Sequence, residues 1–420
     1  MRLARNLSIF TFFNLVNAGI PFLLLPILTT YLSASDYGII DIFNGIVKLF
    51  TPILGLSIIY SINRFYFEDD IDLKVFVNTI FKSLVKYSLY SSVIIILLII
   101  IIGDNYLSSF GLPVKVLIYA TIYILFSQLS EIILILWRAS YKTVYYGVFR
   151  VSKTIIDIAL SVLLIVQFDY NWQGRIAPQT VISILFGLFS LYILFKQKYI
   201  FNQINFNKDY QKKALSYSLP LIFHSLSGYV IATSDRFFIL FIEGIESTGV
   251  YGVAYQIGMV IGLFQNSFNQ AWTPFFFSSL NKKSVKLNIK IVKITYVYFI
   301  LLIFIVFVFY FITPLLYKYL IGSQFQRGIE IVVWILLGYA FNGMYKMMVN
   351  YLFYIKRTKE IAIYTILAAI LNLILNYFLI TLNGMIGAAQ ATAISFLFLF
   401  IVVSIAAKNA YQMPWSLKHK

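Results

Sequence analysis

The 420-residue sequence contains no cysteine, and its only two histidines are His224 and His419. Without cysteine there can be no disulfide and no cysteine-ligated metal, and two histidines are too few for a histidine-rich metal site. Charged residues make up 12% of the chain, against roughly 25% in soluble globular domains. We therefore expect neither a metal nor another cofactor, and the scarcity of charge is typical of a membrane protein.

Hydrophobic residues are in large excess. They make up 60% of the chain, against roughly 45–50% in soluble domains, and they form runs of about 20 residues or more, the length that spans a bilayer. These runs predict an all-α membrane protein with about 12 transmembrane helices. The predicted spans are residues 8–32, 37–65, 79–103, 114–138, 147–168, 177–197, 214–242, 249–280, 288–313, 327–355, 360–380 and 385–408. Because the first run exceeds the roughly 7–15 residues of a signal-peptide core, we expect it to be a retained helix.

The net charge of +17 arises from 33 Lys and Arg against 16 Asp and Glu. The basic residues lie mostly in short runs between the apolar spans. When the N-terminus is placed inside, most of them fall in inside segments, as the positive-inside rule requires. This pattern predicts a multi-pass protein with both termini in the cytoplasm, and it argues against binding to nucleic acid.

A weak internal repeat divides the chain near its middle. Residues 33–38 and 246–252 each contain a Tyr-Gly pair, and each is followed by a long apolar run with a Thr-Pro pair, at residues 51–52 and 273–274. About six spans in each half predict two six-helix lobes related by a pseudo-two-fold axis along the membrane normal, with a substrate path between them. The predicted domains are an N-terminal lobe (1–197), a cytoplasmic linker (198–213), a C-terminal lobe (214–408) and a cytoplasmic tail (409–420). The alternative is a chance coincidence of two Tyr-Gly pairs.

Charged residues inside the predicted spans are the main sign of function. A charge at the bilayer centre costs at least about 2.5–3.5 kcal/mol, so a charge that is kept there generally serves a site. Lys48, Arg236 and Lys346 come from both predicted lobes, and they predict a cationic central cavity for a phosphate or pyrophosphate. The predicted substrate-binding residues are Lys48, Arg236, Lys346, Arg64, Asn44, Asn342 and Asn350.

Acidic residues and one histidine accompany these cations. The predicted coupling or counter-ion residues are Asp41, Asp157, Asp235, Glu131 and His224. Asp235 and Arg236 are adjacent and project about 100° apart on a helix, so we do not expect them simply to neutralise each other. The structural alternatives are snorkelling of Arg64 to the cytoplasmic interface, pairing of Asp235 with His224 or with a charge on another helix, and pairing of Lys48 and Lys346 with Asp157 or Glu131.

Four short runs resemble those of a known family. They are PILTTYLSASDYG (26–38), SLPL (218–221), DR (235–236) and GVYG (249–252). The runs resemble the Wzx-type O-antigen and polysaccharide lipid flippases, which belong to the polysaccharide transporter family of the multidrug/oligosaccharidyl-lipid/polysaccharide exporter superfamily. The resemblance covers nearly the whole chain.

This resemblance implies a twelve-helix fold of two lobes around a cationic cavity in the bacterial inner membrane. It implies a transporter, not an enzyme, that moves undecaprenyl-pyrophosphate-linked oligosaccharide from the cytoplasmic to the outer leaflet for O-antigen or capsule assembly. Alternating access driven by H⁺ or Na⁺ is the family expectation, and Arg236 would bind the pyrophosphate. Candidate partners are the lipid-linked oligosaccharide, membrane lipids, a polysaccharide polymerase and chain-length proteins.

Two other functions compete with this interpretation. An ion-coupled drug or organic-cation antiporter of the same superfamily would expose acidic residues in its cavity, whereas the cavity candidates here are at least as basic. A membrane-embedded enzyme of polysaccharide synthesis would need catalytic groups on a sizeable outer loop. The predicted outer loops are short and carry neither an acid pair nor a Ser-His pair.

Overall fold

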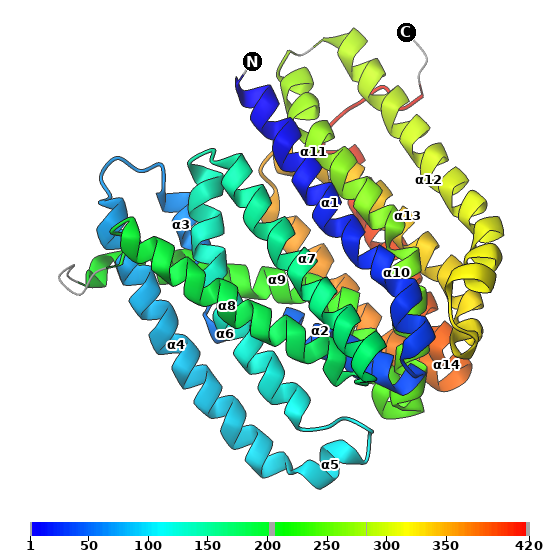
Figure 1. The fold of residues 1–420 in the computed structure, drawn as a ribbon. Coiled ribbons are helices and arrows are strands. Elements are labelled where there is room, and N and C mark those ends of the chain that lie inside the picture. The colour runs from blue at the N-terminus through cyan, green and yellow to red at the C-terminus, as the bar shows by residue number, and fades with distance from the viewer. Residues whose placement is uncertain (1, 201–205, 283, 417–420) are drawn as a thin grey trace. The chain divides into compact units, whose positions relative to one another are not determined.

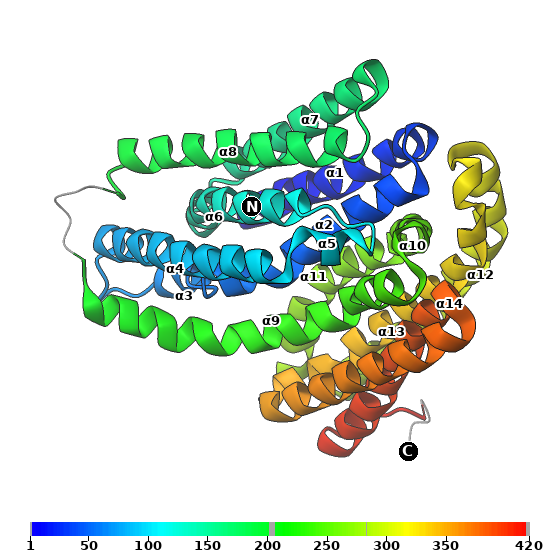
Figure 2. The same cartoon turned by 90° about the horizontal axis from the view of Figure 1, so that it is seen from below.

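The computed structural model describes residues 2–200, 206–282 and 284–416, which fold almost entirely into helices (Figures 1 and 2). No β-strand occurs among these residues. The elements are α1 (Arg2–Tyr31), α2 (Ala34–Leu54), α3 (Tyr60–Phe65), α4 (Leu73–Ile102), α5 (Asp104–Ser108), α6 (Lys115–Ala139), α7 (Thr143–Phe168), α8 (Gln173–Lys196), α9 (Lys208–Glu243), α10 (Ile245–Gly258), α11 (Val260–Asn281), α12 (Val285–Leu320), the 3₁₀-helix η1 (Ser323–Gly328), α13 (Ile329–Tyr354) and α14 (Thr358–Ala410).

The predicted all-α membrane fold is confirmed. Within the described residues, 9 helical stretches are long and apolar enough to cross a membrane, and a shorter apolar helix lies at Gly19–Tyr31 within α1. Helix α14 is one of the 9, but Gly384 inside it has φ 60° and ψ −143°, so the chain forms two helices there. A positive φ of this kind suits glycine, which has no Cβ to clash. The break corresponds to the gap between the predicted spans 360–380 and 385–408.

The chain divides into two compact units, Met1–Tyr229 and Val230–Lys420, which are described separately below as unit 1 and unit 2. The division falls inside α9, beyond the predicted linker at 198–213. Residues 201–205 of that linker lie outside the described residues. The lobe boundaries at 197 and 214 therefore stay a prediction.

Unit 1 is held together by close helix crossings. Helix α8 packs against α6 and α7, α1 packs against α7, and α2 packs against α6 (Figure 2). A Cβ built on Gly147 of α7 would lie 2.0 Å from the Phe13 ring of α1, and one on Gly187 of α8 would lie 2.8 Å from the Phe126 carbonyl oxygen of α6. Small residues permit such crossings, which drive helix association in membranes through van der Waals contact.

The predicted span 37–65 is not one kinked helix. Helix α2 ends at Leu54, two residues after Pro52, and Leu56 and Ser57 both have a φ of 51° before α3 begins. Proline removes a helical hydrogen bond and clashes with the preceding turn. The side chain of Gln128 on α6 donates from Nε2 to the Thr51 carbonyl oxygen at 3.0 Å, which satisfies a backbone group that the break would otherwise expose.

The first link of the sequence repeat, residues 33–38, caps the start of helix α2. Ser33 and Asp36 form a capping box at the start of α2, in which each side chain accepts from the other residue's backbone N–H. Such reciprocal caps satisfy two of the helix's unpaired donors. Asp36 Oδ1 also accepts from the backbone N–H of Trp172, at 3.2 Å, in the link between α7 and α8. One side chain therefore both starts a helix and anchors a neighbouring loop.

Unit 2 is centred on α13. The two halves of α14 and helices α10, α11 and α12 pack against it. A Cβ on Gly258 of α10 would lie 2.5 Å from Ile335 Cγ2 of α13, so a small residue again allows a close crossing. The predicted span 249–280 is divided at Met259, between α10 and α11, while Pro274 lies inside α11. The repeat therefore places its proline in a different helical context in each half.

The close crossing of α6 and α8 predicts that Gly187→Leu destabilises unit 1. The new Cβ would meet a backbone oxygen that cannot move aside easily, and overpacking of this kind costs about 1–3 kcal/mol. Thermal stability of the purified protein in detergent checks this. Gly19→Leu is the matched control, because a Cβ on Gly19 of α1 has nothing within 4 Å. Equal melting temperatures for the two variants would contradict the close crossing.

Candidate functional site

Unit 1 contains a polar cavity of about 260 Å³ lined by α1, α6, α7 and α8. Its charged lining residues are Glu131 from α6 and Arg150, Lys153 and Asp157 from α7. The three residues of α7 follow three- and four-residue spacing, which places them on one face of the helix. The cavity is smaller than the roughly 300–1,000 Å³ of typical small-molecule pockets. It suits an ion or a few water molecules better than a sugar.

A buried ion pair lies beside this cavity. Arg175 of α8 donates from Nη1 to Asp157 Oδ1 at 2.9 Å and to Ser161 Oγ at 2.8 Å, and Arg175 is only 8% exposed. Removing one partner of a buried pair leaves an uncompensated charge and is strongly destabilising. Arg175 falls between the predicted spans 147–168 and 177–197, whereas in the structure it lies within α8 and is buried. Asp157 thus has a partner other than Lys48 or Lys346.

Two further contacts organise the same cavity. The Asn17 amide of α1 lies 2.7 Å from Thr154 Oγ1 of α7, and Arg150 donates from Nη1 to the Tyr146 hydroxyl at 2.6 Å. The Lys153 ammonium lies 5.7 Å from the centroid of the Tyr123 ring on α6, within the range of a cation–π interaction. Glu131 therefore shares a small cavity with two cations that are already positioned by neighbouring groups.

The predicted residues of this region lie on two separate helices, α2 and α3. On α2, Asp41 and Asn44 are half-buried and Lys48 is exposed. Arg64 belongs to α3, beyond the break, where it forms an ion pair with Glu68 at 2.6 Å and its side chain is 53% exposed. This placement supports the interfacial alternative for Arg64, since an exposed i,i+4 pair needs no cavity.

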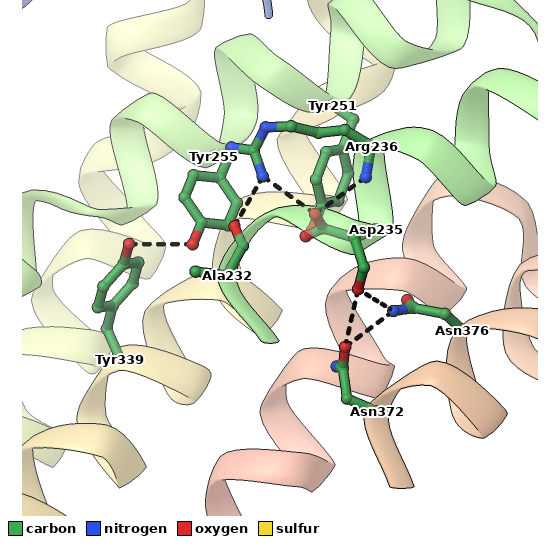
Figure 3. Close-up of polar contacts among 9 residues, drawn as sticks. Ala232, Asp235, Arg236, Tyr251, Tyr255, Tyr339, Asn372 and Asn376 are labelled. Atoms are coloured by element: carbon green, nitrogen blue, oxygen red, sulfur yellow. Dashed lines mark hydrogen bonds and ion pairs between the residues drawn. The ribbon is translucent and has the colours of Figure 1, made fainter. Parts of the chain in front are cut away.

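The centre of unit 2 is a buried pair of adjacent residues on α9, Asp235 and Arg236, which are 0% and 3% exposed (Figure 3). Arg236 Nη1 donates to Asp235 Oδ1 at 3.0 Å and to the Ala232 carbonyl oxygen at 2.9 Å. The expectation that these neighbours would not neutralise each other was wrong. The long arginine side chain curls back along its own helix and reaches the carboxylate.

Tyrosines surround this pair. The Tyr251 hydroxyl donates to Asp235 Oδ2, and the Arg236 guanidinium lies 4.2 Å from the centroid of the Tyr255 ring. The Tyr255 and Tyr339 hydroxyls are 3.1 Å apart, so α9, α10 and α13 meet here (Figure 3). A guanidinium over an aromatic face gains more when it is desolvated. The cluster can therefore hold a charge pair deep within unit 2.

An amide network continues from this cluster to α14. Asn376 Nδ2 donates to Asn372 Oδ1 at 3.0 Å, and Ser234 of α9 donates to the same oxygen at 3.2 Å. Such contacts between helices are typical of polar residues inside membranes. The side chain of His224 lies outside the described residues, so its predicted pairing with Asp235 stays a prediction.

Lys346 lies on α13 and is half-buried. Its ammonium donates to Asn266 Oδ1 of α11 at 2.9 Å, and Asn350, one turn later, donates from Nδ2 to the Lys346 carbonyl oxygen at 2.9 Å. Asn342, one turn earlier, is also half-buried. Asn342, Lys346 and Asn350 therefore follow one another at four-residue spacing along α13. The partner of the Lys346 ammonium is a neutral amide, which leaves the positive charge uncancelled by this contact.

Six residues of these clusters were not predicted from the sequence: Arg150, Lys153, Arg175, Tyr251, Tyr255 and Tyr339. The spacing of Arg150 and Lys153 ahead of Asp157 could have indicated their shared face. The i,i+4 pair Tyr251 and Tyr255 carried a similar signal. Arg175 and Tyr339 carried none, because only the packing of distant helices brings them to their partners.

Comparisons with known proteins identify the family of this chain. The family described as "Polysaccharide biosynthesis protein" has a sequence model that matches residues 3–280, more than half of the chain. The Lsg locus putative protein 1 of Haemophilus influenzae is 25% identical over 380 residues, which cover 88% of this chain and 90% of that protein.

Two solved structures share the fold. The lipid II flippase MurJ, in an inward closed conformation, has a TM-score of 0.71 at 19% identity over 96% of this chain and 87% of that chain. An inward-facing multidrug resistance MATE family transporter of the MOP superfamily has a TM-score of 0.70 at 17% identity over 97% of both chains. At these identities the likeness shows the fold alone. Together with the match over residues 3–280, it shows that this multi-pass membrane chain belongs to the polysaccharide biosynthesis protein family.

Proposed function

We propose that this protein is a flippase for lipid-linked oligosaccharide, and that its substrate is the undecaprenyl-pyrophosphate-linked repeat unit of an O-antigen or capsule. The observation that carries the proposal is the match of residues 3–280 to the polysaccharide biosynthesis family on a chain with a transporter fold. Movement from the cytoplasmic to the outer leaflet of the inner membrane by alternating access is part of the same proposal.

Fold alone does not separate a flippase from a drug antiporter, because the chain resembles structures of both kinds. The charges favour the flippase. Lys48 is exposed on α2, and the Lys346 ammonium donates to the neutral amide of Asn266. Two of the acids that an organic cation could use, Asp157 and Asp235, are each engaged by an arginine. Basic groups on spanning helices suit a pyrophosphate.

The proposal includes that the protein is not an enzyme. Translocation requires binding and release of the substrate but breaks no bond, so it needs no catalytic acid, base or metal. Among the described residues, no group of three His, Asp or Glu side chains could hold a metal ion. The similar solved proteins are a flippase and a transporter by their names.

Within this proposal the three predicted cations have different tasks. Lys48 and Lys346 attract the pyrophosphate as point charges. Arg236 is 3% exposed and already held by Asp235, Ala232 and Tyr255, so a pyrophosphate can reach it only if Asp235 gives way. In the resting state Arg236 therefore orders the centre of unit 2.

The polar cavity of unit 1 is proposed as the coupling site. It holds Glu131 among Arg150, Lys153 and Asp157, and its volume of about 260 Å³ suits H⁺ or Na⁺ with water. Because Asp157 is paired with Arg175, Glu131 is the acid that remains for an exchangeable ion. A polysaccharide polymerase and chain-length proteins are the proposed partners downstream.

The cations predict the outcome of a flipping assay. Proteoliposomes carrying labelled undecaprenyl-pyrophosphate oligosaccharide would be scored by access of an impermeant reagent. We expect Lys48→Gln and Lys346→Gln each to slow translocation by roughly 10- to 100-fold, since a hydrogen bond to a charged group contributes about 1.5–3 kcal/mol. Arginine at either position should retain more activity than glutamine, because it keeps the charge.

The control for this assay is Lys86→Gln, which removes an exposed lysine from the spanning helix α4 and should leave translocation unchanged. Arg236→Ala is a poor probe of substrate binding, because it would strip Asp235 of its ion-pair partner and cost stability. If the wild type fails to flip the lipid under any ion gradient and exports an organic cation instead, the flippase proposal is wrong.

The position of Glu131 in the cavity predicts that its replacement changes ion coupling without changing stability. We expect Glu131→Gln to retain the thermal stability of the wild type and to make translocation insensitive to an imposed H⁺ or Na⁺ gradient. The check is the ratio of translocation rates with and without the gradient. Glu360→Gln, on the exposed start of α14, is the control and should keep that ratio. A gradient response in Glu131→Gln equal to that of the wild type would remove this residue from the coupling site.

The proposed orientation predicts which loops face the cytoplasm. Since the chain has no cysteine, single cysteines can be introduced without further changes. An impermeant maleimide added to intact cells should label Asn171→Cys, between α7 and α8, and should not label Lys212→Cys, near the start of α9. Lysis should expose both positions. The opposite labelling would reverse the orientation derived from the positive-inside rule.

A further inference from the structure

Unit 1 has a second hollow, which none of the proposed site residues lines. It is a groove of about 1120 Å³ between α7 and α8, floored by the end of α6. The two helices pack against each other and run in opposite directions, because the short link at residues 169–172 joins them. In Figure 1 they converge at this link. The lining residues are Trp137, Lys142, Val144, Tyr145, Val148, Phe149, Ser152, Leu185, Phe186, Phe189, Tyr192, Ile193, Lys196 and Gln197.

The groove is apolar along its length and basic at one end. Lys142 immediately precedes α7 and Lys196 ends α8, so the antiparallel helices bring both lysines to the same mouth. Among the described residues that line the groove, none is acidic. The mouth therefore carries two positive charges above an apolar interior.

The length of the groove matches one leaflet of a bilayer. Along α7 its lining extends from Lys142 to Ser152, ten residue steps, and along α8 from Lys196 back to Leu185, eleven residue steps. At about 1.5 Å per residue each wall is about 15 Å long, half of the roughly 30 Å hydrocarbon core. A chain that enters at the basic mouth would thus end near the bilayer midplane.

Aromatic contacts and hydrogen bonds at the helix ends hold the walls of the groove in place. The Phe149 ring lies 4.9 Å from Phe186 and 5.7 Å from Trp137, measured between centroids. At the mouth, the Lys142 N–H donates to the Trp137 carbonyl oxygen at 2.8 Å, and the Tyr199 N–H donates to the Leu194 carbonyl oxygen at 2.9 Å. Both are six-to-one bonds of the kind that close helix C-termini. The backbone that carries the two lysines is therefore fixed at the mouth.

We propose that this groove binds a phospholipid with an anionic headgroup, with the phosphate between Lys142 and Lys196 and an acyl chain along α7 and α8. Basic pockets between transmembrane helices on the cytoplasmic side are typical sites for anionic headgroups. The aromatic residues Tyr145 and Tyr192 suit the boundary between headgroup and chain. This site is separate from the cations proposed to bind the transported substrate and does not depend on the flippase proposal.

A simpler explanation exists for each lysine. Basic residues are expected at cytoplasmic ends of helices, and Lys196 in the last turn of α8 favours the helix dipole. Neither explanation requires selectivity among lipids. The experiment must therefore measure selectivity and must compare lysines at the groove with lysines elsewhere on the same side.

The test uses the delipidated full-length protein in detergent, titrated with phosphatidylglycerol, phosphatidylcholine or a polyprenyl phosphate, with bound lipid counted by native mass spectrometry. We expect phosphatidylglycerol to bind more tightly than phosphatidylcholine, and the double variant Lys142→Gln/Lys196→Gln to reduce that preference at least about tenfold. The control is Lys282→Gln/Lys286→Gln, which removes two exposed lysines, one directly after α11 and one in the first turn of α12, and should keep the preference.

A second variant tests the apolar part. Val148 is 52% exposed and lines the groove, so Val148→Trp should fill the groove without unfolding the protein and should also reduce binding of phosphatidylglycerol. Unchanged melting temperatures would show that both groove variants are folded. Equal binding of phosphatidylglycerol and phosphatidylcholine, or a preference that survives both groove variants, would overturn the proposal. Displacement of phosphatidylglycerol by equimolar polyprenyl phosphate would also overturn it, because the groove would then belong to a polyprenyl lipid.

Discussion

Inside a bilayer every backbone N–H and C=O must find a partner within the protein, because an unsatisfied group costs several kcal/mol. This constraint explains why the described apolar segments are helices and why their interruptions are so specific. Where α2 ends after Pro52, the Gln128 side chain takes up the Thr51 carbonyl oxygen. Where α2 begins, Ser33 and Asp36 supply the cap. A side chain distant in sequence thus completes the first of these hydrogen-bond patterns, and local side chains complete the second.

The low dielectric of the membrane interior also determines which charges can be buried. An isolated charge in hydrocarbon is too costly to keep, so buried charges are paired or hydrogen-bonded. Arg175 is held by Asp157 and Ser161 in unit 1, and Arg236 by Asp235 and the Ala232 carbonyl in unit 2. Both pairs join their helix to others, directly through Arg175 and through Tyr251 in unit 2. These ion pairs therefore stabilise the packing of the helices.

The difference between the partners of the arginines and those of the lysines supports the functional proposal. The buried arginines are engaged by carboxylates, whereas Lys346 has an amide partner and Lys48 is exposed. Cationic groups that can donate to its oxygens are what a pyrophosphate needs. The family assignment supplies the kind of substrate, and the lysines supply the chemistry that would recognise it. A basic groove between α7 and α8 would meet the surrounding lipid by the same chemistry without taking part in transport.

The amino-acid sequence by itself determined the membrane-spanning helices, because long apolar runs admit no other backbone arrangement in a bilayer. It also revealed the charges within the spans and the family resemblance of residues 26–38. It could not assign partners to those charges. Arg175 falls between two predicted spans, and the side chains of Asp235 and Arg236 project in different directions on an ideal helix. In the structure both arginines are buried in ion pairs. Partners of this kind are set by which helices lie against each other and by how far an arginine side chain bends, and only the tertiary structure decides those.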